Sequence, residues 1–258
     1  MESLISVIMP AYNAGLTILD SIESIQRQTF PHWELLIIDD GSNDDTLNKV
    51  RKLAKNEGRI RVFCQAKNVG AAACRNLGLT LAKGKFIAFC DADDLWVSEK
   101  LKVQAEQFQD NQVGVVYSSY RKFKDTCDPS SKVVGAPETG DFNQLTFSNY
   151  ICMSSAAVRR DCLEGVLFPS IRMHEDYAFW LLLMKKPIEA RGCAEPLVWY
   201  RENPHGISAN KIRAARYHWM ILREFTQLAF IPRCMRFGVY LSNGIAKHGF
   251  KKTFFNLG

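Results

Sequence analysis

The sequence predicts an α/β fold, in which a mostly parallel sheet is flanked by helices and followed by a basic helical extension. Short apolar runs alternate four times with helical segments in the first half of the chain, and the connections between them are short. This alternation is typical of a doubly wound, Rossmann-like sheet. Polar side chains follow several of the apolar runs. Such a sheet binds its ligands beyond the carboxyl ends of its strands, so these side chains are candidate site residues.

The first half of the chain supplies four predicted strands, each mostly apolar and therefore expected to be buried. They cover residues 4–9, 33–38, 60–64 and 86–90. Asn13 is expected to cap the first helix, and Ser42 and Asp45 have the spacing of a capping box before the second. The core face of the first helix is predicted at Leu16, Leu19, Ile22 and Ile25. Further helices are expected at 71–82 and 98–111.

The second half of the chain is predicted to add strands at 113–118, 150–158 and 196–201. Residues 122–146 are rich in Asp, Pro, Ser and Gly, which indicates a long surface loop or lid. Glu175 and Asp176 begin an apolar helix, where the helix dipole is expected to keep Asp176 ionised at neutral pH. A helix at 209–229 and a short helical or irregular basic segment complete the chain.

Composition indicates a soluble globular protein, with 47% hydrophobic and 23% charged residues among 258. The eight cysteines have no CxxC spacing, so we expect reduced thiols rather than a zinc site or a disulfide framework. No signal peptide and no run of about 20 apolar residues is recognisable, so no membrane-spanning helix is expected. These features predict a cytoplasmic protein.

Charge is concentrated at the C-terminus. The chain carries +6 in total, but residues 201–258 hold ten Lys or Arg against two Asp or Glu, a net +8, which leaves −2 for the rest. Aromatic side chains are interleaved with these cations, which suits a peripheral helix on the inner face of an anionic membrane. The alternative is that the aromatics pack on the preceding domain and the basic face is simply solvated.

The most informative stretch is Asp91-Ala92-Asp93-Asp94, which directly follows the predicted strand 86–90. Carboxylates this close repel one another and are costly to bury without a cation. Mg²⁺ and Mn²⁺ prefer carboxylate oxygens, so the stretch is a candidate metal site. A solvated acidic turn that begins the next helix is the alternative, with Asp94 in that structural role. A second acidic strand end, Asp39 and Asp40, favours the metal site because both ends would face one crevice.

The usual phosphate-binding loops are missing. The first strand is followed by Pro10-Ala11-Tyr12-Asn13, and the chain has neither a Gly-x-Gly-x-x-Gly after that strand nor a Gly-Lys-Ser/Thr loop. A bound nucleotide diphosphate would therefore need a metal and basic side chains for neutralisation. A metal-dependent nucleotidyltransferase would be expected to carry a Gly-rich basic loop here. A nucleic-acid-binding module would leave the strand-end carboxylates unexplained.

Taken together, the chain resembles the family 2 glycosyltransferases, inverting enzymes of GT-A fold that use nucleotide sugars. The resemblance spans about residues 4–205 and depends on five segments in order: 6–13, 37–42, 68–76, 89–94 and 175–180. It implies a catalytic domain at 1–205, with a nucleotide-binding half at about 1–112 and an acceptor-binding half at 113–205. Residues 206–258 form an extension outside the family pattern. Cys74 and Cys90 are small departures at positions that need no charge.

The resemblance also implies roles for individual residues. Pro10, Ala11 and Tyr12 would line the base pocket, and Asp39 would accept a hydrogen bond from a uracil imide. Asp93 would ligate a divalent metal (Mn²⁺ or Mg²⁺), with Asp91 at the ribose or the metal. Asp176 would be the general base. Arg75 would lie near the base or diphosphate. Apart from the resemblance, Arg201 and His205 are candidates for the phosphates by their charge, although a loop histidine is more often a plain surface residue.

The function implied is transfer of a sugar, with inversion, from a nucleotide-diphosphate sugar to a saccharide hydroxyl. A UDP-sugar donor and a lipid-linked acceptor in cell-surface polysaccharide or lipopolysaccharide synthesis are expected. Peripheral contact with an anionic membrane is expected, and a nucleic-acid partner is not. The alternatives are a metal-dependent nucleotidyltransferase or a basic nucleic-acid-binding module.

Overall fold

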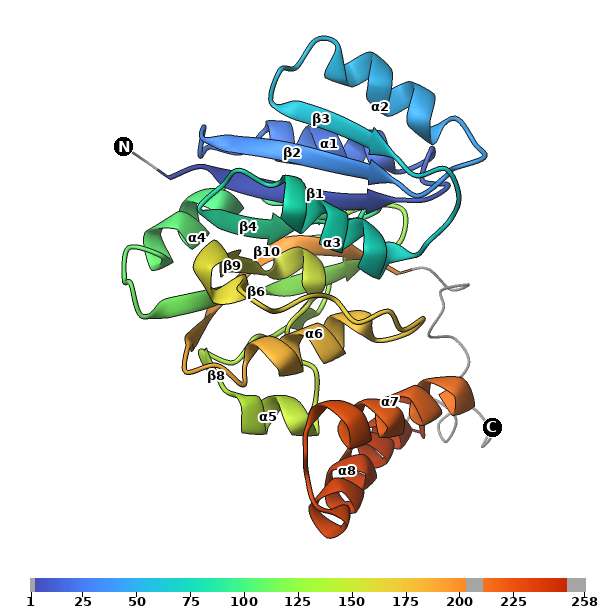
Figure 1. Cartoon of the computed structure of the whole chain (residues 1–258), viewed down its shortest axis with the longest axis vertical. Helices are drawn as coiled ribbons and strands as arrows, with labels where there is room; N and C mark the ends of the chain where they lie inside the picture. The colour runs from blue at the N-terminus through green and yellow to red at the C-terminus, as the bar shows by residue number, and fades with distance from the viewer. Residues whose placement is uncertain (1–2, 203–210, 250–258) are drawn as a thin grey trace.

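One mixed sheet runs through the computed structural model, which describes residues 3–202 and 211–249 (Figure 1). Its strand order is β3-β2-β1-β4-β9-β6-β10-β5, with β7 paired to β6 and β8 paired to β10. The strands are β1 Ile5–Ala11, β2 Trp33–Asp39, β3 Ile60–Cys64, β4 Phe86–Phe89, β5 Leu95–Trp96, β6 Val113–Phe123, β7 Val133–Val134, β8 Thr139–Gly140, β9 Ala157–Arg159 and β10 Glu189–Arg201.

Helices cover both faces of the sheet and extend beyond one end of it (Figure 1). They are α1 Ile18–Gln26, α2 Thr46–Ala54, α3 Ala71–Leu81, α4 Lys100–Gln107, α5 Phe142–Phe147, α6 Glu175–Leu183, α7 Lys211–Phe225 and α8 Phe230–Gly249, with 3₁₀ turns at Met153–Ser155 and Arg160–Leu163. One core packs α3 and α6 against the sheet, and the other packs α1 and α4 against the opposite face. The predicted α/β class is confirmed.

The first half of the sheet is parallel, as predicted. Strands β3, β2, β1 and β4 are all parallel neighbours. The short β9 then pairs antiparallel with both β4 and β6, and β10 continues parallel to β6. The carboxyl ends of β1, β2 and β4 therefore meet at one edge, which is where ligands bind in such sheets.

The start of α1 differs from the prediction. Leu16 is 96% exposed and Leu19 is 38% exposed, whereas Ile18, Ile22 and Ile25 are buried. The helix begins only at Ile18, and Asn13, which has a left-handed backbone (φ 48°), does not cap it. The predicted capping box before α2 is also wrong. The Ser42 hydroxyl oxygen accepts from the Asn13 N–H, and Asp44 accepts from the Thr46 N–H instead.

The second half departs more from the sequence prediction. Residues 122–146 are not one long loop, since they hold the end of β6, the short strands β7 and β8, and most of α5. Residues 150–158 form a 3₁₀ turn followed by the start of β9 rather than a continuous strand. Ser155 explains the turn, because its side chain and its backbone N–H both donate to the Cys152 carbonyl.

The C-terminal extension packs on the preceding domain through α5 and α6. Ile221 and Leu222 of α7 are fully buried. His218 is stacked between Tyr177 of α6 and Tyr240 of α8, with ring centroids 5.3 and 3.8 Å away. The second segment is a 20-residue helix, not a short or irregular one. Within the described ranges, no helix has the length and apolar content needed to cross a bilayer.

Candidate functional site

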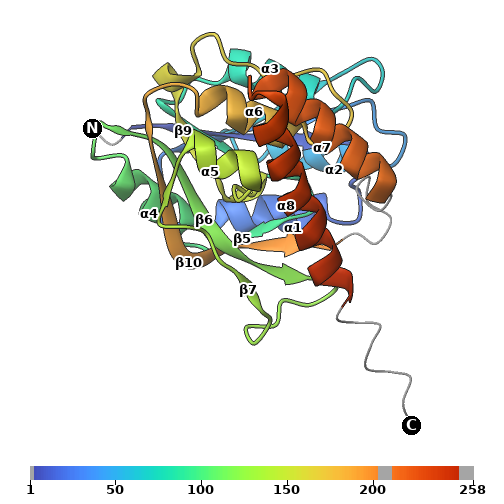
Figure 2. The same ribbon diagram turned by 90° about the horizontal axis from the view of Figure 1, so that it is seen from below.

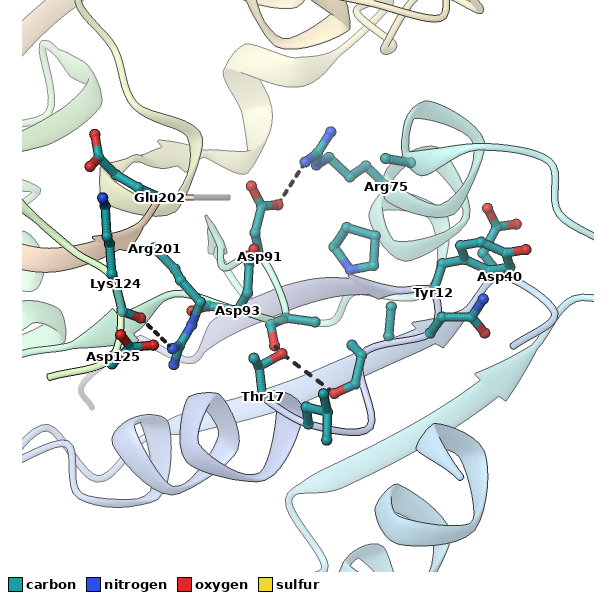
Figure 3. Close-up of a pocket in the computed structure, with 17 residues that line it drawn as sticks. Tyr12, Thr17, Asp40, Arg75, Asp91, Asp93, Lys124, Asp125, Arg201 and Glu202 are labelled. Atoms are coloured by element: carbon teal, nitrogen blue, oxygen red, sulfur yellow. Dashed lines mark hydrogen bonds and ion pairs between the residues drawn. The ribbon is translucent and has the colours of Figure 1, made fainter. Parts of the chain in front are cut away.

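A cavity of about 800 Å³ lies at the carboxyl edge of the sheet, where β1, β4 and β10 end (Figure 3). Figure 3 shows Lys124 and Arg201 on one side and Tyr12 on the other, with Asp91 and Asp93 between them. The lining residues come from both halves of the chain: Pro10, Ala11, Tyr12, Asn13, Ala14, Leu16, Thr17, Asp40, Ala71, Arg75, Asp91, Ala92, Asp93, Lys124, Asp125, Arg201 and Glu202.

The loops after β1 and β2 are tied to each other beside this cavity. The Asn13 N–H donates to the Ser42 hydroxyl oxygen at 3.0 Å, and the Asn43 N–H donates to the Asn13 side-chain oxygen at 2.9 Å. Gly41 between them has φ +70°, and a Cβ there would lie 3.0 Å from the Lys67 carbonyl carbon. The positive φ and the close approach both favour glycine. The loops are thus fixed before any ligand binds.

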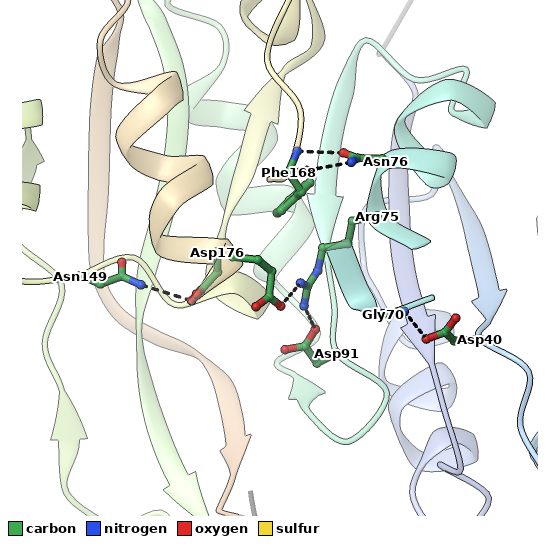
Figure 4. A network of polar contacts seen from close by, with 9 residues as sticks. Asp40, Gly70, Arg75, Asn76, Asp91, Asn149, Phe168 and Asp176 are labelled. Atoms are coloured by element: carbon green, nitrogen blue, oxygen red, sulfur yellow. Dashed lines mark hydrogen bonds and ion pairs between the residues drawn. The ribbon is translucent and has the colours of Figure 1, made fainter. Parts of the chain in front are cut away.

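Asp39 and Asp40 lie next to each other but differ in what they contact. Both oxygens of Asp40 accept backbone N–H groups, from Val69 at 2.7 Å and Gly70 at 2.9 Å, so this carboxylate fixes the start of α3 (Figure 4). Asp39 pairs with Ala11 across β1 and β2 and is fully buried. Its Oδ2 accepts from the Ser42 N–H, but its Oδ1 has no partner among the described residues. Asp40 lines the cavity, whereas Asp39 lies just behind it.

Arg75 on α3 joins two acidic groups that are far apart in the sequence (Figure 4). Its Nη2 donates to Asp91 Oδ1 at 2.7 Å and its Nη1 to Glu175 Oε1 at 3.0 Å. The Arg75 side chain is only 5% exposed. Although burial alone would lower the pKa of Arg75, the charges of Asp91 and Glu175 outweigh it and raise the pKa. This buried cation therefore links the loop after β4 to the start of α6.

The three carboxylates after β4 have different surroundings. Burial, and then the charge of Asp91, raises the pKa of Asp93 to about 6. Burial and the charges of Asp91 and Asp93 raise the pKa of Asp94 well above its usual range. Asp94 Oδ1 accepts from the Arg201 N–H at 2.9 Å, so Asp94 anchors β10 and does not begin the next helix, which starts at Lys100. Asp93 is left as an acid whose negative charge is poorly compensated.

Arg201 is fixed beside Asp93. Its Nε donates to the Asp93 carbonyl and its Nη1 to the Lys124 carbonyl, both at 2.9 Å. Its guanidinium lies over the Phe123 ring, 4.4 Å from the centroid. A guanidinium held in this way presents its charge to the cavity without further loss of side-chain freedom.

Asp176 lies in the first turn of α6, directly after the Glu175 that binds Arg75. Its Oδ2 accepts from the Asn149 side-chain amide at 3.2 Å (Figure 4). Burial and the neighbouring charge of Glu175 raise the pKa of Asp176, and they outweigh the lowering by His174, the Tyr177 N–H and Arg75. Burial and the charge of Glu175 therefore act on the pKa of Asp176 in the direction opposite to the helix dipole.

Most of the predicted site residues come together in the structure. Seven line the cavity: Pro10, Ala11, Tyr12, Arg75, Asp91, Asp93 and Arg201. Asp39 and Asp176 lie outside its lining, Asp39 directly behind it and Asp176 next to the Glu175–Arg75 pair. His205 lies outside the described residues. Within the described ranges, no group of three or more His, Cys, Asp or Glu is arranged to hold a metal by itself.

Sequence reasoning missed the residues that close the far side of the cavity. Lys124 and Asp125 lie in the segment read as a loop, and Glu202 follows the last strand. Asn149 was missed as a partner of Asp176, and Glu175 as the second partner of Arg75. Nothing local in the sequence marks these contacts, since each joins groups at least 27 positions apart.

Comparison with known families decides the class of protein. The sequence profile of Glycosyl transferase family 2 matches residues 6–167, which is more than half of the chain. The chain belongs to this family. It is a glycosyltransferase, and the nucleotidyltransferase and nucleic-acid-module alternatives are set aside as its function.

Two relatives of this family 2 enzyme match it over nearly their whole length. A protein of Bacillus subtilis named as a putative teichuronic acid biosynthesis glycosyltransferase, TuaG, is 34% identical over 95% of this chain and 98% of its own. WfgD of Escherichia coli is 35% identical over 96% of both chains. It is named a UDP-Glc:α-D-GlcNAc-diphosphoundecaprenol β-1,3-glucosyltransferase.

Solved structures confirm the GT-A fold of the enzyme. TarS of S. aureus in complex with UDP-GlcNAc superposes with a TM-score of 0.71 at 20% identity, over 97% of this chain and 76% of that one. The mannosyltransferase PcManGT of Pyrobaculum calidifontis, in complex with GDP-Man and Mn²⁺, gives a TM-score of 0.68 at 20% identity, over 96% and 76%. At this identity the likeness concerns the fold alone.

Proposed function

We propose that this family 2 glycosyltransferase transfers a sugar, with inversion, from a UDP-sugar to a hydroxyl of a lipid-linked saccharide in cell-surface polysaccharide synthesis. The observation that carries the proposal is the cavity in which Asp93, Arg75 and Arg201 face one space at the strand ends. A poorly compensated acid that shares one cavity with two fixed cations suits a metal-bound diphosphate. The names of TuaG and WfgD support the substrate class.

The donor base would bind where β1 ends. Pro10, Ala11 and Tyr12 line that part of the cavity, and Tyr12 is 46% exposed, so its ring is available for stacking. Asp39 Oδ1 is a buried carboxylate oxygen without a partner among the described residues. A buried acceptor left unpaired is costly, and an imide N–H would remove that cost. A uracil base would supply that N–H, and the UDP-Glc in the name of WfgD supports a UDP-sugar donor.

The residues present fit a divalent metal, Mn²⁺ or Mg²⁺, at the diphosphate. The pKa of Asp93 is raised to about 6 by burial and by Asp91, and a cation would relieve both effects. One or two carboxylates together with substrate phosphates are a common way to bind such ions, so Asp93 with help from Asp91 is sufficient. When bound, the metal would act as a Lewis acid on the diphosphate leaving group.

Cationic side chains would share the charge of the leaving diphosphate. Arg201 is held rigidly at the cavity wall. Arg75 also lines the cavity, and its guanidinium holds Asp91 in place. Bidentate contacts from guanidinium groups suit phosphate oxygens. His205 follows Arg201 by four positions and is a further candidate, and it lies outside the described residues.

Asp176 is proposed as the general base. As the acceptor oxygen attacks the anomeric carbon, a carboxylate oxygen of Asp176 takes the hydroxyl proton, and the bond to the UDP oxygen breaks on the opposite face. An α-linked donor would therefore give a β-linked product. The raised pKa of Asp176 makes it a better proton acceptor than a solvated aspartate. Base catalysis of this kind contributes about 10²–10⁴-fold in rate.

The same proposal assigns the parts of the chain. Residues 1–112 would bind the donor, 113–205 the acceptor, and 206–258 would form the extension. The acceptor would be a saccharide on a lipid diphosphate at the inner face of the cell membrane, and the enzyme would be a cytoplasmic protein in peripheral contact with this membrane.

Closure of the 122–146 segment over the donor stays a prediction, supported by Lys124 and Asp125 at the cavity wall. No nucleic-acid partner is expected.

The test is a panel of UDP- and GDP-sugars offered with a polyprenyl-diphosphate GlcNAc acceptor, with and without Mn²⁺. We expect transfer from a UDP-sugar only, dependence on the divalent metal, and a β-linkage by NMR coupling constants. An α-linked product would contradict the inverting mechanism. Transfer from GDP-sugars alone would contradict the assignment of a UDP-sugar donor.

A further inference from the structure

The outward side of α8 is an apolar surface at the end of the molecule. Helix α8 is the outermost element there and crosses in front of α5 and α7 in Figure 2. Its most exposed large side chains are 37–72% exposed: Phe230, Ile231, Met235, Val239 and Leu241. Cys234, Gly238 and Ser242 complete this side. We call these eight residues the outer α8 face.

The charged residues of 230–242 do not point to this face. They are Arg233 and Arg236. Arg236 bonds inward, with Nε 2.7 Å from the Thr146 hydroxyl and Nη2 2.8 Å from the Asn143 side-chain oxygen. Arg233 donates to the Leu228 carbonyl at 2.6 Å. A surface helix normally turns its charges to water, whereas these two arginines bond to α5 and to the connection between α7 and α8, which leaves the outer α8 face without a charge.

A cationic rim borders the outer α8 face. A groove of about 510 Å³ runs between α7 and α8, lined by Ile212, Ala215, Arg216, Trp219, Met220, Arg223 and Phe237. Trp219 links the two surfaces, since its ring lies edge-on to Phe230 at 6.4 Å and to Phe237 at 5.2 Å. Arg216 and Arg223 are exposed. The sequence of α7 and α8 contains one acidic residue, Glu224, which pairs with Arg223.

We propose that the outer α8 face and the arginines of α7 dock the enzyme on an anionic lipid bilayer. Apolar side chains of α8 would enter the boundary between headgroups and acyl chains. Arg216 and Arg223 would meet lipid phosphates, and Trp219 would lie at the level of the headgroups. Such a helix lies in the interface plane and does not span the membrane. Basic residues near an anionic surface add to the attraction.

Charge favours the bilayer over a second copy of this chain. A two-fold contact brings the same surface of both copies together, so the arginine rims of two molecules would approach each other. An anionic lipid surface instead complements them. The inference rests on the proposed function for its purpose, because a lipid-linked acceptor is reached only at a membrane.

The experiment is co-sedimentation of the full chain with phosphatidylcholine vesicles, with and without phosphatidylglycerol. We expect binding that requires phosphatidylglycerol and weakens with salt. Ile231→Glu together with Met235→Glu should reduce partitioning at least about tenfold, without changing the thermal midpoint, because both side chains are exposed. The matched control is Leu167→Glu, at a 58% exposed position away from α8, which should bind as wild type. Arg216→Gln should bind less tightly and with less dependence on salt.

Equal binding by the α8 variant and wild type would overturn the inference. A second result would also overturn it: wild type forms a dimer in sedimentation velocity, the α8 variant is a monomer, and neither binds vesicles. The outer α8 face would then be a contact between two copies of the chain. Transfer to a water-soluble acceptor, measured on the same preparations, separates the two proposals. An α8 variant that keeps this transfer but loses vesicle binding supports the inference. If the wild type binds vesicles but transfers no sugar, only the proposed function is contradicted.

Discussion

Two acidic pairs face each other across Arg75, and each has one member bound to it. In the loop after β4, Asp91 binds Arg75 and Asp93 does not. At the start of α6, Glu175 binds Arg75 and Asp176 does not. In both pairs the unbound acid has a raised pKa, from burial first and then from its paired neighbour. One buried arginine thus leaves one poorly compensated carboxylate on each side.

The difference between the pairs lies in what surrounds the unbound acid. Asp93 lines the cavity beside the fixed guanidinium of Arg201, where a metal-bound diphosphate suits it. Asp176 lies outside the lining of this cavity, and its Oδ2 accepts from the neutral amide of Asn149. A carboxylate that lines the cavity suits binding of a diphosphate-bound metal, whereas burial and the charge of Glu175 give Asp176 the basicity that proton transfer needs. Similar acidic motifs therefore support different roles.

Removing the shared cation should have the largest effect. Arg75→Met leaves Asp91 and Glu175 without their buried partner, and breaking such a pair costs about 3–5 kcal/mol. Urea unfolding at pH 7 should show this loss. Transfer should fall below detection.

The control for this variant is Arg27→Ala, which breaks an exposed pair with Glu23 and should cost less than about 1 kcal/mol. If Arg75→Met were as stable as Arg27→Ala, the two acidic pairs would not depend on Arg75.

Metal binding should depend on pH if Asp93 is the principal metal ligand. Because its pKa is raised to about 6 in the folded protein, the proton stabilises the metal-free fold below that pH. This stability is lost as pH rises from about 4, the usual range of an aspartate, to about 6. Protons compete with the metal, so Mn²⁺ affinity in the presence of UDP should be roughly tenfold weaker at pH 5 than at pH 7. Calorimetric titration measures it.

Asp93→Asn should abolish this pH dependence along with most of the affinity. The matched Asp125→Asn variant also removes a carboxylate from the cavity wall and should keep the dependence. A pH-independent Mn²⁺ affinity in the wild type would rule Asp93 out as the principal ligand.

The smallest effect is expected at Asn149, which positions Asp176. Its amide donates to Asp176 Oδ2 at 3.2 Å, and its own oxygen accepts from the Ile151 N–H at 3.2 Å. Asn149→Ala removes a hydrogen bond to the charged form, so the pKa of Asp176 should rise. The acidic limb of the kcat/KM profile should move to higher pH, with a loss of about tenfold at neutral pH, since such a bond is worth about 1.5–3 kcal/mol at most. Asn111→Ala, at an exposed position, is the control, and an unmoved limb would contradict the positioning role.

The sequence was sufficient for the parallel half of the fold and for most of the cavity lining. Apolar runs report buried strands directly, and strand ends in a parallel sheet share one edge, so the convergence of Tyr12 and Asp93 was predictable. Contacts such as Arg75 with Glu175 and Asn149 with Asp176 were not, because they are set by packing between distant elements. The inward turn of Arg236 likewise depends on α5, which the polar composition of 122–146 concealed.

The measurement that tests the division of roles most directly compares Asp176→Asn with Asp93→Asn in two assays on the same preparations. One is calorimetric binding of UDP with Mn²⁺, and the other is transfer to a water-soluble acceptor. Asp176→Asn should bind UDP as wild type does and lose about 10²–10⁴-fold in transfer. Asp93→Asn should lose metal-dependent UDP binding, and with it transfer. Near-normal transfer by Asp176→Asn, or unchanged UDP binding by Asp93→Asn, would contradict the assignment.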